Sequence, residues 1–311
     1  MDVSVIILLK NSRKYLEESL KGIFSQKTDL KFEVIAVDSG STDNTLEIAG
    51  KYPVKIFQIP AEEFNHGLTR NYGVSRSQGG YAIFLTPDAV PADAHWMKKL
   101  IDDLEGDARI AGAYSRQVPH RNATALTKVR VGRFFTSGKE KRISYINDPE
   151  EFRKMSLNER HRFCNFDNVS SCIRRSVWEK IPFPRTDFGE DLEWAIKVLA
   201  AGYKIVYESD SLVYHSHEYS IHGWYERNRM NSHSLLFLFD HKPAPGSLRL
   251  LSLALFTALR DMASLFRQGC NRSVVCGFFL APLYAFSGLF GQYCGARDAA
   301  KSLSLEKKDG L

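Results

Sequence analysis

Apolar runs that stop abruptly at an acidic residue recur in this chain, and few architectures accommodate them. Residues 34–38 read Val-Ile-Ala-Val-Asp, and residues 81–88 read Tyr-Ala-Ile-Phe-Leu-Thr-Pro-Asp. Short continuous apolar runs bounded by turn residues are typical of strands that are buried on both faces of a sheet. In open α/β sheets, ligands bind at the carboxyl ends of the strands. The sequence therefore predicts an α/β fold in which Asp38 and Asp88 lie at the ligand-binding edge.

Helical segments separate the predicted strands. One helix is predicted to begin at Asn11 or Ser12, and its apolar face carries residues at helical spacing: Leu16, Leu20, Ile23 and Phe24. The same reading predicts strands at 3–9, 32–37, 54–59, 81–85 and 109–115, and helices at 43–51, 67–76 and 94–104. At 311 residues and 44% hydrophobic content, the chain is long and apolar enough to bury a substantial core.

A third acidic site opens another predicted helix. Glu190 and Asp191 precede apolar residues at helical spacing, and Gly202 supplies the stop. Acids in the first turn of a helix gain roughly 0.3–1 kcal/mol from the helix dipole, which is a sufficient structural reason for them. Asp38 and Asp88 have a structural alternative too, because aspartates beside Gly or Pro often close turns. The residues alone leave both interpretations open.

Two motifs together make the chain similar to a known family. Residues 37–43 read Val-Asp-Ser-Gly-Ser-Thr-Asp, and residues 85–89 read Leu-Thr-Pro-Asp-Ala. The chain resembles family 2 inverting glycosyltransferases of the GT-A fold. Within them, residues 64–71 (Phe-Asn-His-Gly-Leu-Thr-Arg-Asn) make it most similar to bacterial rhamnosyltransferases that build polysaccharides. The resemblance covers roughly residues 3–220 and implies a Rossmann-like, mostly parallel sheet flanked by helices, with a C-terminal helical extension.

The resemblance implies roles for the residues at the strand ends. Asp191, with Glu190 before it, is the expected general base, because the acceptor hydroxyl of a single displacement must lose its proton as it attacks. Asp88 and His215 are expected to hold Mg²⁺ or Mn²⁺, a hard cation that takes carboxylate and diphosphate oxygens. The expected nucleotide contacts are Leu9, Asn11, Asp38, Arg70, Thr86 and Asp88.

Two of these assignments have plain alternatives, and one motif departs from the family pattern. His215 would more often be an ordinary hydrogen-bonded histidine, and Arg70 a solvated helix charge. The metal motif common in this fold is Asp-any-Asp, whereas Thr86-Pro87-Asp88 supplies only the second acid. Metal dependence is thus expected, with Asp88 as the acidic ligand.

The implied activity is transfer of one sugar, with inversion, in bacterial surface polysaccharide synthesis. The expected donor is dTDP-rhamnose and the expected acceptor a glycan, carried on a lipid or free. A UDP-hexose donor and a catalytically silent nucleotide-sugar-binding scaffold are the alternatives. A nucleotidyltransferase would be expected to carry a Gly-rich loop after the first strand, and residues 8–12 contain no glycine. Residues 1–118 are predicted to bind the nucleotide-sugar, 119–243 to complete the acceptor and catalytic half, and 244–311 to form a helical C-terminal region.

The C-terminal region differs in character from the rest of the chain. Residues 273–296 contain no charged side chain, a length that could cross a bilayer, although Pro282 and four glycines dilute the run. Interfacial helices, helices packed on the catalytic domain and a membrane span are the three alternatives, and the first is preferred. An anionic membrane surface is therefore an expected partner, and the expected location is the cytoplasm, peripheral on the inner face of the plasma membrane.

The remaining composition is consistent with that location. Five cysteines without close pairing suggest free thiols in a reducing cytosol, and no secretory signal is expected before Val3. The net charge of +6 includes a basic stretch over residues 128–142. That stretch would suit anionic lipid, a phosphorylated acceptor or a solvated loop. Nucleic acid is not an expected partner, because no recognised binding motif accompanies the charges.

Overall fold

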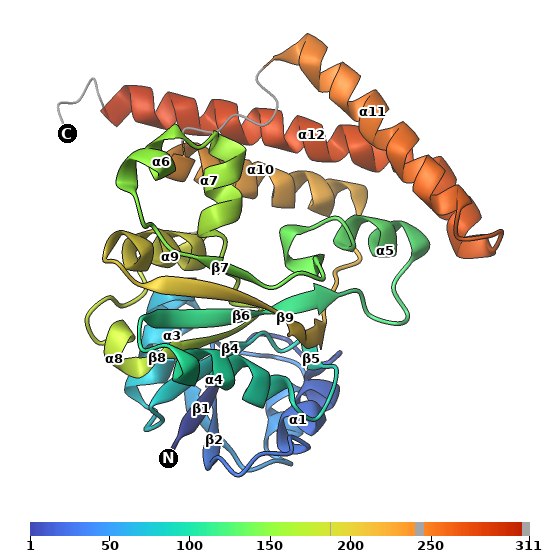
Figure 1. Ribbon diagram of the computed structural model, residues 1–311. Coiled ribbons are helices and arrows are strands. Elements are labelled where there is room, and N and C mark those ends of the chain that lie inside the picture. Colours follow the sequence, from blue (N-terminus) through green and yellow to red (C-terminus); the bar gives the residue numbers. More distant parts are fainter. Residues whose placement is uncertain (187, 240–245, 307–311) are drawn as a thin grey trace. The chain divides into compact units, whose positions relative to one another are not determined.

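The computed structural model describes residues 1–186, 188–239 and 246–306, without the side chains of 303–306 (Figure 1). Contacts divide the chain into two compact units. The first comprises Met1–His120, Phe134–Arg153 and Phe163–Ser216. The second comprises Arg121–Arg133, Lys154–Arg162 and the chain from His217 onward. The boundary predicted at residues 243–244 lies outside the described residues.

A nine-stranded sheet forms the centre of the first unit, as far as the described residues show. Its order is β3 (Val54–Gln58), β2 (Phe32–Asp38), β1 (Val3–Leu9), β4 (Tyr81–Leu85), β8 (Ser170–Arg174), β6 (Ile110–Val118), β9 (Lys204–Tyr214) and β5 (Val90–Pro91), and β7 (Arg142–Ser144) also pairs with β9. The first four strands in that order run parallel. β8 runs antiparallel to both β4 and β6, so the α/β sheet is mixed.

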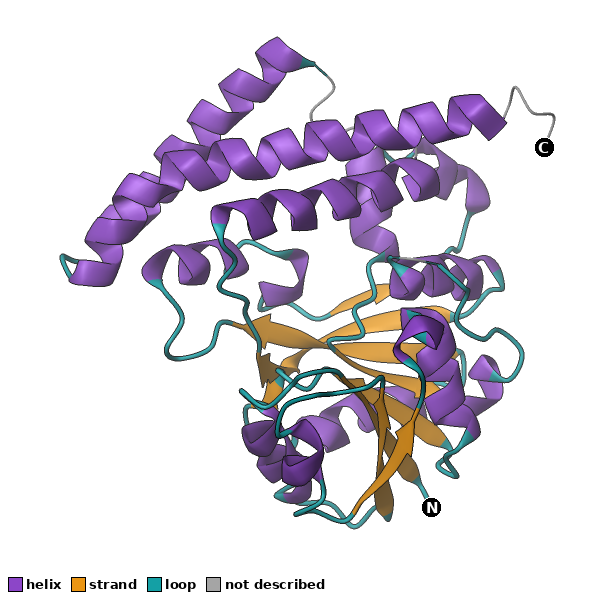
Figure 2. Cartoon of the chain, turned by 180° about the vertical axis from the view of Figure 1, so that it is seen from behind, coloured by secondary structure: helices purple, strands orange, loops and turns teal. Residues whose placement is uncertain are grey.

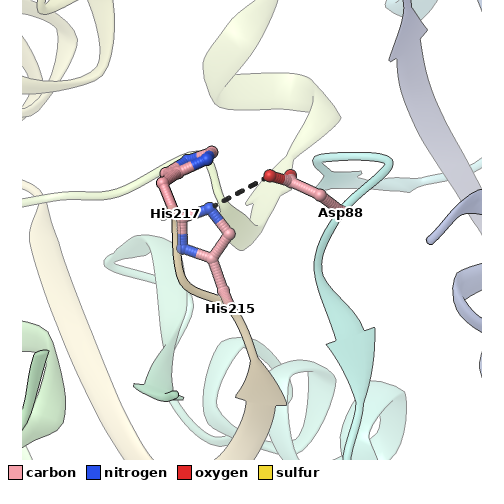
Figure 3. Close-up of side chains that lie close together, drawn as sticks. All are labelled: Asp88, His215 and His217. Atoms are coloured by element: carbon pink, nitrogen blue, oxygen red, sulfur yellow. Dashed lines mark ion pairs between the residues drawn. The ribbon is translucent and has the colours of Figure 1, made fainter. Parts of the chain in front are cut away.

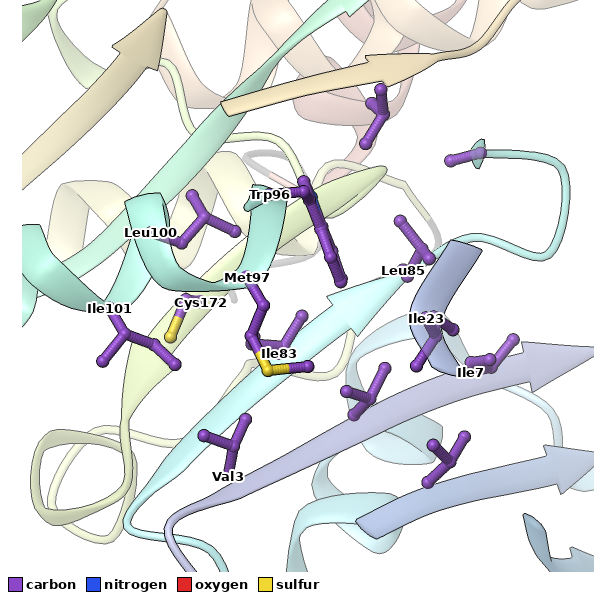
Figure 4. Packing of buried hydrophobic residues seen from close by; sticks show 14 of the residues in the cluster. Val3, Ile7, Ile23, Ile83, Leu85, Trp96, Met97, Leu100, Ile101 and Cys172 are labelled. Carbon is purple, nitrogen blue, oxygen red and sulfur yellow. The ribbon is translucent and has the colours of Figure 1, made fainter. Parts of the chain in front are cut away.

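Helices cover both faces of the parallel part of the sheet (Figure 2). Alternate residues of β1, beginning at Val3, join a core with α1 (Leu16–Phe24) and α4 (Trp96–Gly106), and Figure 4 shows Trp96 and Met97 within it. On the other face, Gly73 of α3 (His66–Ser75) lies so close to Ile6 that an added Cβ would stand 2.6 Å from its Cγ2. Successive residues point to opposite faces of the sheet, and because helices cover both faces, these strands have few polar residues.

The first helix begins later than its sequence suggests. The prediction of a start at Asn11 or Ser12 is wrong, because α1 begins at Leu16. Asn11 has φ 48°, and its side-chain oxygen accepts a hydrogen bond from the backbone N–H of Thr42 at 2.8 Å. Residues 11–15 are therefore a loop tied to the chain after β2. The other helices of this unit are η1 (Ala61–Glu63), α2 (Thr45–Ala49), η2 (Phe135–Ser137), α6 (Pro149–Lys154, its last residue in the second unit), α8 (Arg175–Trp178) and α9 (Glu190–Ala200).

The second unit is helical in its described residues. It contains α5 (Ala125–Val131), most of α7 (Leu157–Cys164), α10 (Ile221–Phe239), α11 (Ser247–Phe266) and α12 (Arg272–Glu306). α12 packs against both α10 and α11. Within α12, Arg272–Ser302 is long and apolar enough to cross a membrane, by length and composition only, and 39% of its most apolar window is buried inside the protein.

Part of the basic stretch is neutralised inside the protein. Arg130 and Arg133 both pair with Asp261 of α11, which is 1% exposed. Lys141 pairs with Asp103 and Glu208. These arginines and this lysine hold secondary structure elements together, which none of the three interpretations of the basic stretch anticipated.

Candidate active site

The loops that follow β1 and β2 are joined by short polar side chains. The Asp38 carboxylate is fully buried and accepts hydrogen bonds from the backbone N–H groups of Gly40, at 3.0 Å, and Ser41, at 3.1 Å. Asp38 thus closes its own turn, where Gly40 has φ 85°. The Leu9 side chain is buried in the core, and its carbonyl accepts from the Ser39 N–H at 3.0 Å. Nucleotide contacts by Leu9, Asn11 and Asp38 remain predictions.

The chain leaving β4 carries a polar group that the protein leaves unsatisfied. The Thr86 hydroxyl is buried and has no hydrogen-bond partner among the described residues. Buried hydroxyls are nearly always paired, so a ligand oxygen beside Thr86 would remove a desolvation cost. Two residues later, Asp88 is partly buried, and its backbone carbonyl lies 3.0 Å from Nε2 of His120. The sequence predicts that the nucleotide-sugar binds at this strand end.

Strand register brings Asp88 and His215 together although they are far apart in the sequence. β5 follows Asp88, β9 precedes His215, and the two strands pair antiparallel with Val90 opposite Tyr214. Nε2 of His215 lies 3.6 Å from an Asp88 carboxylate oxygen (Figure 3). His217 adds a third side chain, and one potential ligand atom from each of the three residues lies within 4.8 Å of the others. The arrangement offers one oxygen and two nitrogen ligands for a metal ion.

Asp191 lies at the start of α9 among other acids. One carboxylate oxygen accepts from the Asn168 N–H at 3.1 Å and the other from the Leu192 N–H at 2.8 Å. Burial, the neighbouring carboxylate of Glu190 and that of Asp167 raise the pKa of Asp191 to about 8. A carboxylate with a pKa near the working pH is suited to accepting a proton in a transition state.

Glu190, the neighbour of Asp191, is buried and forms an ion pair. Its carboxylate is buried and lies 2.5 Å from a guanidinium nitrogen of Arg70, which is also buried. Arg70 donates a second hydrogen bond to the His66 carbonyl of its own helix. The prediction of Arg70 as a nucleotide contact and of Glu190 as a catalytic residue is not tested by this geometry. In the protein itself, the pair holds the first turn of α9 against α3.

Replacing Arg70 with methionine is expected to destabilise the protein by about 3–5 kcal/mol, because the Glu190 carboxylate would be left buried without its charge partner. The double variant Arg70→Met, Glu190→Gln should recover much of that loss, since no charge would then be unpaired. Urea unfolding of the wild type, both single variants and the double variant measures the coupling. Additive losses from the two substitutions would contradict an energetic pairing.

Three polar residues of this edge were not singled out as candidates from the sequence: Gln117, Asp167 and Asn168. Gln117 and Asp167 lie at the end of β6 and just before β8, and neither position carries a motif. His217, by contrast, has a local signal, its spacing of two residues from His215. The three are recognisable only through the pairing of β8 with β4 and β6.

Comparison with known proteins identifies the family of this chain. The family model described as Glycosyl transferase family 2 matches residues 4–169, more than half of the chain. The chain belongs to glycosyltransferase family 2. This glycosyltransferase is 33% identical over 231 residues to the O-antigen chain rhamnosyltransferase RfbN of Salmonella typhimurium, covering 73% of the chain and 70% of that protein. It is 34% identical to WbaN of Salmonella anatum, an O-antigen chain rhamnosyltransferase, over 66% of the chain and 62% of that protein.

Solved structures confirm the predicted fold class of the glycosyltransferase. The mannosyltransferase PcManGT of Pyrobaculum calidifontis, solved with GDP-Man and Mn²⁺, has a TM-score of 0.55 at 17% identity, over 97% of this chain and 75% of that one. Residues 1–349 of TarS from S. aureus, solved with UDP-GlcNAc, have a TM-score of 0.51 at 19% identity, over 97% and 92%. The fold is that of the GT-A glycosyltransferases, as predicted.

Proposed function

We propose that this glycosyltransferase moves a single rhamnose, with inversion, from dTDP-rhamnose to a glycan acceptor in the synthesis of a bacterial surface polysaccharide. The observation that carries the chemistry is Asp191, a carboxylate at the start of α9 whose pKa is raised by burial and by neighbouring acids. The names of the two Salmonella relatives support rhamnose as the sugar. A nucleotide-sugar donor is further supported by the ligands of the similar solved structures.

In the proposed reaction, Asp191 accepts the proton of the acceptor hydroxyl as that oxygen attacks the anomeric carbon. Glu190 and Arg70 hold the turn that carries Asp191. Asp88, His215 and His217 would hold a divalent cation, Mn²⁺ or Mg²⁺, and their mixed oxygen and nitrogen donors fit such an ion. The cation would act as a Lewis acid that neutralises charge on the departing diphosphate. Thr86 is two residues before Asp88, and its buried hydroxyl, which has no partner among the described residues, would hydrogen-bond to the same nucleotide-sugar.

The test of this function is release of nucleoside diphosphate from a panel of donors, dTDP-rhamnose and UDP-hexoses among them, with glycan acceptors on a lipid carrier and free. The expected result is acceptor-dependent turnover of dTDP-rhamnose that requires Mn²⁺ or Mg²⁺. Turnover of a UDP-hexose alone would overturn rhamnose and keep the chemistry. Binding of donors without turnover of any would support the scaffold alternative.

We also infer that the second unit binds an anionic phospholipid surface, which would keep the enzyme cytoplasmic and peripheral on the inner face of the plasma membrane, near a lipid-linked acceptor. Large apolar side chains are exposed at helical spacing along α11: Leu248, Leu251, Leu255, Leu259 and Phe266. A similar exposed series lies along α12: Val275, Phe279, Leu283, Phe286 and Phe290. Contiguous exposed apolar faces of this kind mark interaction sites.

The charges around these faces favour lipid over another protein chain as the partner. Residues 246–302 contain five arginines, Lys301 and two acids, Asp261 and Asp298. The arginines and Lys301 are exposed, whereas Asp261 is buried between Arg130 and Arg133, and Asp298 pairs with Arg229. The accessible charge of the segment is therefore mostly positive. Each arginine near an anionic bilayer contributes about 1 kcal/mol of attraction.

Replacing Leu251, Leu255 and Leu259 together with glutamine is expected to lower binding to phosphatidylglycerol vesicles by at least about tenfold, because three exposed apolar side chains would no longer enter the interface. Vesicle flotation measures the binding, with phosphatidylcholine vesicles as the uncharged comparison. Ile143→Gln is the matched control, since Ile143 is exposed to the same extent as Leu251 but lies in the first unit. Unchanged flotation with an altered sedimentation coefficient would instead make this face a contact between two copies of the chain.

A further inference from the structure

A buried glutamine connects the proposed cation site with the acids around Asp191. Gln117 is the penultimate residue of β6 and is paired with Val213 of β9. Its side chain is 5% exposed and makes two hydrogen bonds. Its amide nitrogen donates to an Asp167 carboxylate oxygen at 2.7 Å, and its amide oxygen lies 2.9 Å from Nδ1 of His215. All of these residues belong to the first unit.

The two side-chain hydrogen bonds of Gln117, with Asp167 and with His215, can be assigned a donor and an acceptor each. An ionised carboxylate only accepts hydrogen bonds, so the NH₂ group of Gln117 must face Asp167. The other Asp167 oxygen accepts from the Val169 N–H at 2.9 Å, which agrees with that role. The carbonyl oxygen of Gln117 then faces His215, and because it can only accept, Nδ1 of His215 must carry the hydrogen.

The position of this hydrogen decides which nitrogen of His215 can bind a metal. A neutral imidazole carries one hydrogen, so a hydrogen on Nδ1 leaves the lone pair on Nε2. Nε2 is the atom that lies 3.6 Å from the Asp88 carboxylate. The opposite tautomer would point an N–H toward the place where a cation would bind and would leave the Gln117 oxygen facing a second acceptor.

We propose that Gln117 is a positioning residue that holds His215 in the tautomer with its hydrogen on Nδ1, so that the Nε2 lone pair is directed at the divalent cation, and that Asp167 sets the orientation of Gln117. The proposal rests on the proposed function, since it needs a cation at Asp88 and His215. Partners of this kind, which orient metal-binding histidines without touching the metal, typically change metal affinity by 10- to 100-fold.

Strand pairing places Gln117 between the two groups that it contacts. β6 lies between β8 and β9 in the sheet, so a side chain at the end of β6 can reach the residues that precede β8 and those that follow β9. Gln117 is held there by its backbone as well, because its carbonyl accepts a hydrogen bond from the Ser137 hydroxyl at 2.9 Å. That backbone contact offers a matched control, since losing it leaves both amide contacts in place.

The decisive variant is Gln117→Met, which keeps the shape of the side chain and removes both hydrogen bonds. Mn²⁺ binding to the full chain without donor, measured by electron paramagnetic resonance, should weaken by about 10- to 100-fold. Ser137→Ala should leave Mn²⁺ binding within about twofold of the wild type. Asp167→Asn is the second variant, because an amide there no longer dictates the orientation of Gln117.

A second measurement reads the tautomer directly and needs no metal. In protein labelled with ¹⁵N-histidine, the metal-free wild type should show His215 with its hydrogen on Nδ1, whereas Gln117→Met and Asp167→Asn should show mixed tautomers. A wild type with the hydrogen on Nε2, or unchanged Mn²⁺ affinity in Gln117→Met, overturns the role of Gln117 alone. Failure of the wild type to bind Mn²⁺, with the expected tautomer present, overturns instead the cation site of the proposed function.

Discussion

Replacing Asp191 with asparagine is expected to lower kcat by about 10²- to 10⁴-fold while leaving donor binding close to that of the wild type. Asparagine keeps the shape of the side chain but cannot accept the proton of the acceptor hydroxyl. Donor binding should persist because Asp88 and Thr86 are unchanged. Steady-state kinetics with saturating donor and acceptor measure the loss, and retention of more than half of the wild-type rate would remove Asp191 from the role of base.

The same substitution should stabilise the protein at alkaline pH. Burial, Glu190 and Asp167 raise the pKa of Asp191 to about 8 in the folded protein, from an ordinary value of 3.8. A group whose pKa is higher in the folded state binds its proton more tightly there, so its contribution to stability is present at low pH and is lost as pH rises from about 4 to about 8. Asparagine does not ionise, and Asp191→Asn should therefore melt at least about 2 °C higher than the wild type at pH 8.5.

A control separates this effect from a general effect of removing acids from α9. Glu193 lies in the same first turn but pairs with Lys197 at 2.8 Å and is partly exposed. Glu193→Gln should keep kcat within about twofold and should not raise the melting temperature. Loss of activity together with gain of stability is the combination that a purely structural helix-capping acid would not produce, because removing a favourable cap lowers stability.

The fold was predictable from the sequence to the extent that its signals are local. The runs of β1, β2 and β4 are apolar except for Ser4, Glu33 and the terminal Asp38, so the burial of these strands is expected from composition. The start of α1 was not predictable in this way. Asn11 has a good helix-capping side chain, but that side chain is used by Thr42, which follows the next strand. A contact between two loops overrides the local preference.

The candidate site also has parts that local sequence predicts and parts that depend on distant contacts. A strand-end aspartate suggests a ligand contact, and the juxtaposition of Asp88 with His215 agrees with the family resemblance. The contacts of Asp38 and Arg70 with groups of the protein itself could not be read from the sequence, because the partner of Arg70 lies on a helix far along the chain. Gln117 and Asp167 carry no motif at all. The role proposed for them depends on which group donates and which accepts in each hydrogen bond, and this is visible only once the strands are paired.

Replacing Asp88 with alanine is expected to weaken Mn²⁺ binding by at least about 100-fold, more than the loss of an orienting partner such as Gln117. Asp88 is the only acid in the group with His215 and His217, so its removal leaves two uncharged imidazoles to hold a dication. Donor affinity with Mn²⁺ present should then fall to the value that the wild type has in EDTA. The comparison in EDTA is needed because direct donor contacts would persist without metal.

Asp93→Ala is the matched control for this prediction. Asp93 follows the same short strand β5, but its carboxylate pairs with Lys99 at 2.8 Å and is not part of the histidine group. Calorimetric titration with Mn²⁺ and then with donor should give wild-type values for it. If Asp88→Ala keeps its Mn²⁺ affinity and still binds donor more tightly with metal than in EDTA, the cation is held elsewhere. His215 and His217 would then be hydrogen-bonding residues, the alternative that applies to most histidines.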